Sequence, residues 1–123
     1  MQWPNIVIAN SDPARAALLA KGLREHSKNL TTASSPEELH NAVLKHRADV
    51  VIADLETVSL EDVRQLHNEL KNVNVVCTHR VPDEQMWAAA LDAGAGDCCC
   101  ASDVDDVVRA AFDRPYKVRS QAA

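Results

Sequence analysis

The sequence predicts an α/β protein in which five parallel strands alternate with helices. Short apolar runs recur roughly every 20 to 25 residues, the length of a strand, a crossover helix and two loops. Helical patterns with capping residues separate these runs. Such an alternation is typical of a parallel sheet that carries helices on both faces.

The strand predictions rest on runs that are apolar and rich in β-branched residues. They cover residues 6–9, 30–33, 50–53, 73–77 and 98–100. The run at 50–53 is the most apolar and reads as a strand buried on both faces of the sheet. The run at 30–33 is the weakest of the five. A helical bundle is disfavoured because the runs are too short and too β-branched to be helix cores.

Each predicted helix begins at a capping residue, and two capping positions show the spacing of a capping box. The starts are Asp12-Pro13, Ser35-Pro36-Glu37-Glu38, Ser59-Leu60-Glu61-Asp62, Pro82-Asp83-Glu84 and Ser102-Asp103. Gly94 ends the fourth helix and Pro115 ends the fifth. The predicted apolar faces include Leu18, Leu19 and Leu23; Leu39, Val43 and Leu44; Val63, Leu66 and Leu70; Met86, Trp87, Ala90 and Leu91; Val104, Val107, Val108, Ala111 and Phe112. We place one domain at residues 1–115 and a short tail at 116–123.

Composition excludes several classes of function. The chain has 123 residues, a net charge of −5 and no cluster of Lys and Arg, so the electrostatic footprint of a nucleic-acid binder is missing. No apolar stretch approaches the roughly 18 residues that span a bilayer. The start of the chain lacks the basic and apolar segments of a signal peptide. We expect a cytoplasmic protein that binds neither nucleic acid nor membrane.

Polar residues stand where the predicted strands end. Right-handed crossovers favour the strand order 2-1-3-4-5, which makes the first and third strands neighbours. Asn10, Ser11 and Asp12 should then lie beside Asp54, at the sheet edge where open α/β folds place their ligands. Asp54 ends the most apolar run, although an Asp there can also simply cap a turn.

These segments, in this order, resemble the receiver domain of two-component response regulators over essentially the whole chain. Residues 6–13 look like its first strand and acidic pair, 32–39 like its second strand and helix, and 93–97 like its Gly-Ala turn. Residues 48–55 and 75–78 look like the strands that carry the phosphorylated aspartate and the switch Ser/Thr. The resemblance implies a flavodoxin-like fold, with Asp54 as phosphoacceptor and Thr78 as switch residue. His79 is expected at the site edge because it directly follows Thr78.

Several positions depart from the receiver pattern. The acidic pair falls on Asn10 and Ser11, and the lysine falls on Ala101. Asp12 stands one position late, where a helix cap is the expected role. Since Mg²⁺ prefers carboxylate oxygens, we expect no metal, no other cofactor and no enzymatic activity. The pattern indicates a degenerate receiver, or pseudo-receiver.

Three functions remain open. The leading one is a signalling module that binds a protein partner, which could be a histidine kinase, an output domain or a second copy of the chain. A homodimer would use the face of helix four, strand five and helix five. The alternatives are a working phosphoacceptor, phosphorylated on Asp54, and a flavodoxin-like domain that binds a small ligand. Against the last, no Gly-rich loop follows the first strand.

The cysteines and histidines carry weaker predictions. Three consecutive cysteines cannot ligate one ion from a regular strand, because alternate side chains face opposite sides. Cys77, Cys98, Cys99 and Cys100 are expected to pack as small apolar residues, with a redox pair that includes Cys77 as the alternative. Solvation is the expectation for His26, His40, His46 and His67.

Overall fold

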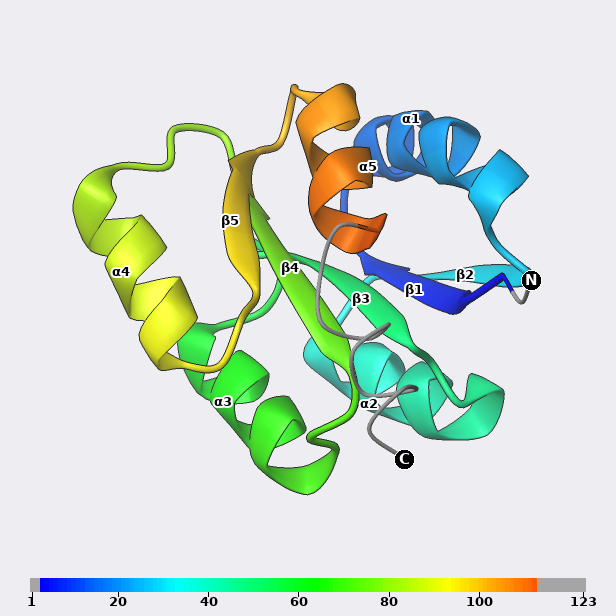
Figure 1. Ribbon diagram of the computed structural model, residues 1–123, viewed down its shortest axis with the longest axis horizontal. Coiled ribbons are helices and arrows are strands. Elements are labelled where there is room, and N and C mark those ends of the chain that lie inside the picture. The colour runs from blue at the N-terminus through cyan, green and yellow to red at the C-terminus, as the bar shows by residue number, and fades with distance from the viewer. Residues whose placement is uncertain (1–2, 113–123) are drawn as a thin grey trace.

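A computed structural model describes residues 3–112 and contains the predicted parallel sheet. The five strands follow the order β2-β1-β3-β4-β5 (Figure 1). The strands are β1 (Asn5–Ala9), β2 (Asn29–Ala33), β3 (Val50–Asp54), β4 (Asn74–His79) and β5 (Asp97–Cys100). The helices are α1 (Pro13–Leu23), α2 (Pro36–His46), α3 (Leu60–Glu69), α4 (Glu84–Asp92) and α5 (Val104–Phe112). Pro115 and the predicted tail lie outside the described residues.

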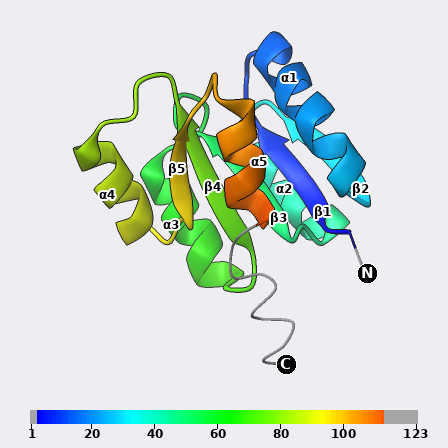
Figure 2. The ribbon, with the colours of Figure 1, turned by 45° about the horizontal axis from the view of Figure 1, so that its top comes forward.

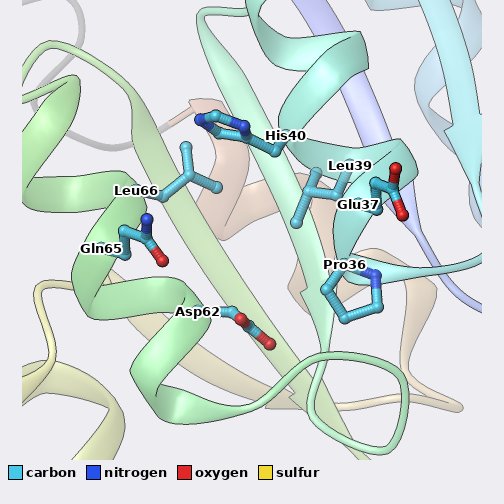
Figure 3. Close-up of a pocket in the computed structure, with 7 residues that line it drawn as sticks. All are labelled: Pro36, Glu37, Leu39, His40, Asp62, Gln65 and Leu66. Carbon is cyan, nitrogen blue, oxygen red and sulfur yellow. The ribbon is translucent and has the colours of Figure 1, made fainter.

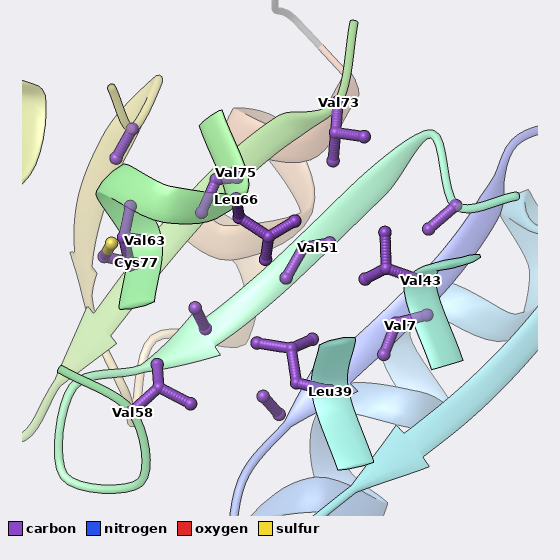
Figure 4. Close-up of a cluster of buried hydrophobic side chains, with 14 of the residues drawn as sticks. Val7, Leu39, Val43, Val51, Val58, Val63, Leu66, Val73, Val75 and Cys77 are labelled. Atoms are coloured by element: carbon purple, nitrogen blue, oxygen red, sulfur yellow. The ribbon is translucent and has the colours of Figure 1, made fainter. Parts of the chain in front are cut away.

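The helices form two layers around the sheet (Figure 2). Helices α1 and α5 cover one face, where Leu19, Leu23 and Val107 pack against Ile6, Ile8 and Ile52. Helices α2, α3 and α4 cover the other face, where the opposite residues of the same strands are buried with Leu39, Val43 and Leu66 (Figure 4). Every residue of β3 is buried, as expected for a central parallel strand.

Capping side chains define where the helices begin. Asp12 caps α1 by accepting a hydrogen bond from the Ala14 amide. The predicted capping box at α3 is complete, since Ser59 and Asp62 bond reciprocally to each other's backbone N–H. At α2 only half of the predicted box forms. Ser35 accepts from the Glu38 amide, but the Glu38 carboxylate turns to Ser34 instead.

Three residues from the predicted apolar helix faces are exposed. Leu18 and Leu44 are 59% and 52% exposed, and Trp87 is 45% exposed. The buried face of α1 consists of Ala16, Leu19, Ala20 and Leu23. Leu18 is not on this face, so its side chain is exposed to solvent. A short 3₁₀ turn, Arg24–His26, also extends α1 beyond the predicted helix.

Close contacts join several elements. Gly22 lets α1 approach α5, since a Cβ there would lie 2.6 Å from a methyl carbon of Val104. The buried Asn74 at the start of β4 donates from Nδ2 to the carbonyl oxygen of Ala111 at 3.3 Å and, at 3.5 Å, to that of Ala110. None of the helices within residues 3–112 is long and apolar enough to cross a membrane.

Two histidines expected to be solvated are packed against distant parts of the chain. His26 lies between the rings of Trp3 and Phe112, with ring centroids 5.7 and 5.5 Å apart. His67 of α3 lies against Gly94, where an added Cβ would overlap the imidazole. The sequence pattern placed both on polar faces because these contacts come from distant parts of the chain.

Candidate functional site

The carboxyl ends of β1, β3 and β4 meet at one edge of the sheet. Asp54, the last residue of β3, pairs in register with Thr78 of β4. Ala9 of β1 pairs with Ala53, so Asn10 follows directly beside Asp54. The predicted convergence of Asn10, Asp54 and Thr78 is therefore present.

The Asp54 carboxylate is buried and held by hydroxyl groups. Its residue is 4% exposed. Thr78 donates from Oγ1 to Oδ1 at 3.1 Å, and Thr57 donates from Oγ1 to Oδ2 at 3.3 Å. The Asp54 carbonyl oxygen accepts from the amides of Thr57 and Val58, both at 2.9 Å, which fixes the loop after β3. Asp54 thus caps its loop and presents a carboxylate at the same time.

The residues after β1 form a second polar group. Asn10 is 5% exposed, and its Oδ1 accepts from the Asp12 amide at 2.9 Å. Its Nδ2 atom has no hydrogen-bond partner among residues 3–112. Ser11 is linked to the loop after β3, because its amide donates to Thr57 Oγ1 at 2.9 Å. Thr57 therefore connects the two groups of site residues.

A hollow of about 170 Å³ opens over these residues. It is lined by Asn10, Ser11, Asp12, Arg15, Asp54, Glu56 and Arg80. The lining does not include His79, whose Nδ1 instead accepts from the Val81 amide at 3.0 Å. The next residue, Arg80, extends into this region and donates to Glu56 at 2.8 Å. Arg80, two residues after Thr78, is therefore the residue of this loop that lines the hollow.

Arg15, Arg80, Glu56 and Thr57 are site residues that the sequence analysis missed. Arg15 stands one helical turn after the capping Asp12 and lies 3.7 Å from its carboxylate. That spacing was readable from the sequence. The positions of Arg80, Glu56 and Thr57 depend on loop conformations, for which the sequence offers no periodic pattern.

Ala101, directly after β5, brings no charged group to the site. It is buried, and its amide donates to the His79 carbonyl oxygen at 2.8 Å. The cations nearest the hollow are instead the two guanidinium groups of Arg15 and Arg80.

The site residues do not fit a divalent metal. Asn10 uses its oxygen for the Asp12 amide, and Asp12 is engaged by the Ala14 amide and by Arg15. Asp54 is the one carboxylate at the floor of the hollow, and both its oxygens accept hydroxyl protons. No group of three or more His, Cys, Asp or Glu residues within 3–112 could hold a metal ion. An all-oxygen magnesium site needs more free carboxylate than this edge provides.

The four cysteines are free thiols in different environments. Cys77 and Cys98 are register partners on adjacent strands, and both are buried. Burial raises the pKa of the Cys77 thiol to about 12 and also raises the pKa of Cys98 and of the buried Cys99. Cys100 differs, because hydrogen bonding with Ser102, 3.2 Å away, lowers its pKa. Three thiols are therefore poorly reactive, and Cys100 is the activated one.

A second hollow, of about 210 Å³, lies between α2 and α3 (Figure 3). Leu39 and Leu66 form its apolar part, with Glu37 and Gln65 among the polar residues around it. His40 lies 2.9 Å from the Glu69 carboxylate, and this hydrogen bond lowers the pKa of Glu69. No residue predicted from the sequence as part of the site lines this hollow.

Comparison with known proteins identifies the fold. No protein-family model matches the sequence, and no curated protein matches it. The signal receiver domain of the response regulator NarL from Mycobacterium tuberculosis superposes with a TM-score of 0.83 at 13% identity, over 92% of this chain and 96% of that one. A chain of the CheX–CheY–BeF₃–Mg²⁺ complex from Borrelia burgdorferi gives 0.79 at 19% identity, over 89% and 87%.

A third structure shows the same fold in a phosphorylated protein. The response regulator from Burkholderia pseudomallei, solved with a phosphorylated aspartic acid, a calcium ion and citrate, gives a TM-score of 0.79 at 15% identity. The match covers 98% of this chain and 73% of that one. The chain therefore has the flavodoxin-like fold of response-regulator receiver domains. At these identities the likeness extends to the fold alone.

Proposed function

We propose that this chain is a degenerate receiver-like module of two-component signalling, which acts by binding a protein partner. The observation that carries the proposal is the contrast at the strand ends. Asp54 and Thr78 are present, buried and hydrogen-bonded, at the positions where the receiver resemblance puts phosphoacceptor and switch. Asn10, Ser11 and Ala101 are neutral where that resemblance puts the acidic pair and the lysine.

The neutral residues argue against efficient phosphoryl transfer. Charge that develops on a transferring phosphoryl group needs a metal ion or fixed cations for stabilisation. The carboxylates around Asp54 are engaged elsewhere, and the two arginines at the rim are already paired with acids. We therefore propose that Mg²⁺ is not a cofactor and that the module has no enzymatic activity of its own.

The proposed partner surface is the face formed by α4, β5 and α5. Trp87 of α4 is exposed there, and exposed aromatic side chains are common anchors at interfaces. Trp87 is held in place by donating from Nε1 to Asp97 at 3.3 Å. A histidine kinase, an output domain or a second copy of the chain would fit this role. Four free thiols agree with a reducing, cytoplasmic setting.

Intact mass measurement after incubation with a small phosphodonor and Mg²⁺ tests the phosphoryl part of the proposal. We expect no Asp54-dependent gain of a phosphoryl group. A gain that disappears in Asp54→Asn would instead support the alternative of a working phosphoacceptor, which the Thr78–Asp54 hydrogen bond favours.

Sedimentation of the protein, alone and with a candidate kinase or output domain, tests the partner surface. Trp87→Ala should weaken the association, and Asp54→Ala should leave it unchanged. Leu44→Ala, a similarly exposed apolar residue on α2, is the matched control. Loss of association in Asp54→Ala with the fold intact would make Asp54 a switch and contradict the degenerate interpretation.

A further inference from the structure

Among residues 3–112, no cationic side chain contacts the buried Asp54 carboxylate. Its side-chain partners are the hydroxyls of Thr78 and Thr57. None of the ion pairs formed within residues 3–112 includes it. A buried carboxylate gains substantially from an opposite charge at contact distance. The hollow over the site is the side from which such a charge can arrive.

Asn10 adds an independent requirement. Because Oδ1 accepts from the Asp12 amide, the Nδ2 end of the side chain is fixed by the backbone. That nitrogen is buried and has no acceptor among the described residues, although Asn10 lines the hollow. A buried donor without a partner is costly, so the site lacks one acceptor as well as one cation.

The rim of the hollow is electrically balanced. Arg80 pairs with Glu56 at 2.8 Å, and Arg15 with Asp12 at 3.7 Å. The Asp54 carboxylate is therefore the one acidic group lining the hollow that is not paired with an arginine. A volume of about 170 Å³ corresponds to five or six waters, at roughly 30 Å³ each. A ligand of a few heavy atoms fits this space.

We infer that the hollow binds a small primary amine that carries a neighbouring oxygen, as in an amino alcohol. The ammonium group donates to Asp54, and the oxygen accepts from Asn10 Nδ2. A metal ion cannot accept from that nitrogen, and the ammonium of a partner's lysine carries no nearby oxygen. The inference develops the small-ligand alternative and does not depend on phosphorylation or on the α4–β5–α5 surface.

Titration of the full ¹⁵N-labelled chain with ethanolamine hydrochloride tests the inference. We expect saturable shifts of the Asn10 side-chain amide and of the backbone amides at 10–12 and 54–57. Tetramethylammonium chloride at equal ionic strength should cause none, because it has no N–H donor. Absence of saturation with ethanolamine, or equal shifts with tetramethylammonium, would overturn the inference.

Variants separate the two proposed contacts. Asp54→Asn and Asn10→Ala should each weaken ethanolamine binding by about tenfold or more. Asp92→Asn, at an exposed acid on α4, should bind as the wild type does. Asn10→Ala leaves both hydroxyl contacts of Asp54 in place, so it stays informative if Asp54→Asn does not fold. Unchanged binding in Asn10→Ala would refute the assignment of the ligand's oxygen.

A further titration distinguishes the source of the amine. Nα-acetyl-lysinamide presents the ammonium of a protein side chain without a neighbouring oxygen. Weaker binding than ethanolamine supports the small-ligand assignment. Tighter binding would overturn it, and would leave the proposed signalling role, which rests on the mass and sedimentation experiments, unaffected.

Discussion

At the scale of single residues, the hydroxyl of Thr78 is the most tightly constrained feature of the site. It is fully buried and donates to a buried carboxylate. Removing such a donor leaves a charged acceptor short of one hydrogen bond in a medium where water cannot replace it.

We expect Thr78→Val to lower the free energy of unfolding by about 1–3 kcal/mol. Urea denaturation followed by circular dichroism measures this change. Thr32→Val, at an exposed position of β2, should change it by less than about 0.5 kcal/mol. Equal effects of the two substitutions would show that the hydrogen bond to Asp54 contributes little.

Cys100 should be the reactive thiol of the native protein. Its pKa is lowered chiefly by the Ser102 side chain, whereas burial raises the pKa of Cys77 and Cys98. Since the thiolate is the nucleophile, Ser102→Ala should raise the pKa of Cys100 and slow its alkylation near pH 8. Mass spectrometry after brief iodoacetamide treatment should find one labelled residue. Native labelling of all four cysteines would contradict this assignment.

The sequence was enough to place Asp54, Thr78 and Asn10, because each follows an apolar run whose end is easy to recognise. It was not enough to find Arg80 or to exclude His79. Those two are adjacent in the chain, and which of them reaches the hollow depends on the loop between β4 and α4. An unpaired amide such as Asn10 Nδ2 is visible only once the atoms around it are known.

At the scale of secondary-structure elements, the turn between α4 and β5 depends on Gly94. Its φ is 108°, in a region that side chains with a Cβ rarely adopt, and its Cα faces the His67 ring.

We expect Gly94→Ala to destabilise the fold by about 1–3 kcal/mol, from backbone strain together with displacement of His67. The thermal midpoint should fall accordingly. In a His67→Ala background the steric part is relieved and the backbone part persists, so the substitution should cost less but still be unfavourable. Full recovery there would mean that the contact, and not φ, controls the position.

All five strands and five helices were predicted in order, since caps and apolar runs are local signals. The errors concern which way a helix faces. Leu18 and Leu44 were predicted on the buried helix faces because they are apolar. In α1, however, Ala16 and Ala20 are buried and Leu18 is exposed. Small residues at a close approach, like Gly22 against Val104, carry little weight in a hydrophobic pattern.

At the scale of the whole molecule, the proposal that Mg²⁺ is not a cofactor makes a prediction for thermal stability. A ligand that binds only the folded state raises the melting temperature, by an amount that grows with the logarithm of its concentration once that exceeds Kd. Because Asn10 and Ser11 offer no carboxylate, millimolar Mg²⁺ should not raise the melting temperature of wild type or of Asp54→Asn. A rise with Mg²⁺ concentration in wild type that is absent in Asp54→Asn would show that Asp12 and Asp54 together hold the ion.

Asn74 links the start of β4 to the C-terminal part of α5. Its amide, buried at the start of β4, is bonded to the last carbonyls of α5, so the helix cannot tilt or slide without stranding a polar group in the apolar interior. Lever-like motion of α5 over the sheet is therefore opposed at its C-terminal end. We therefore expect signalling to change which molecule binds the outer surface of α5. The angle between this helix and the sheet should stay the same.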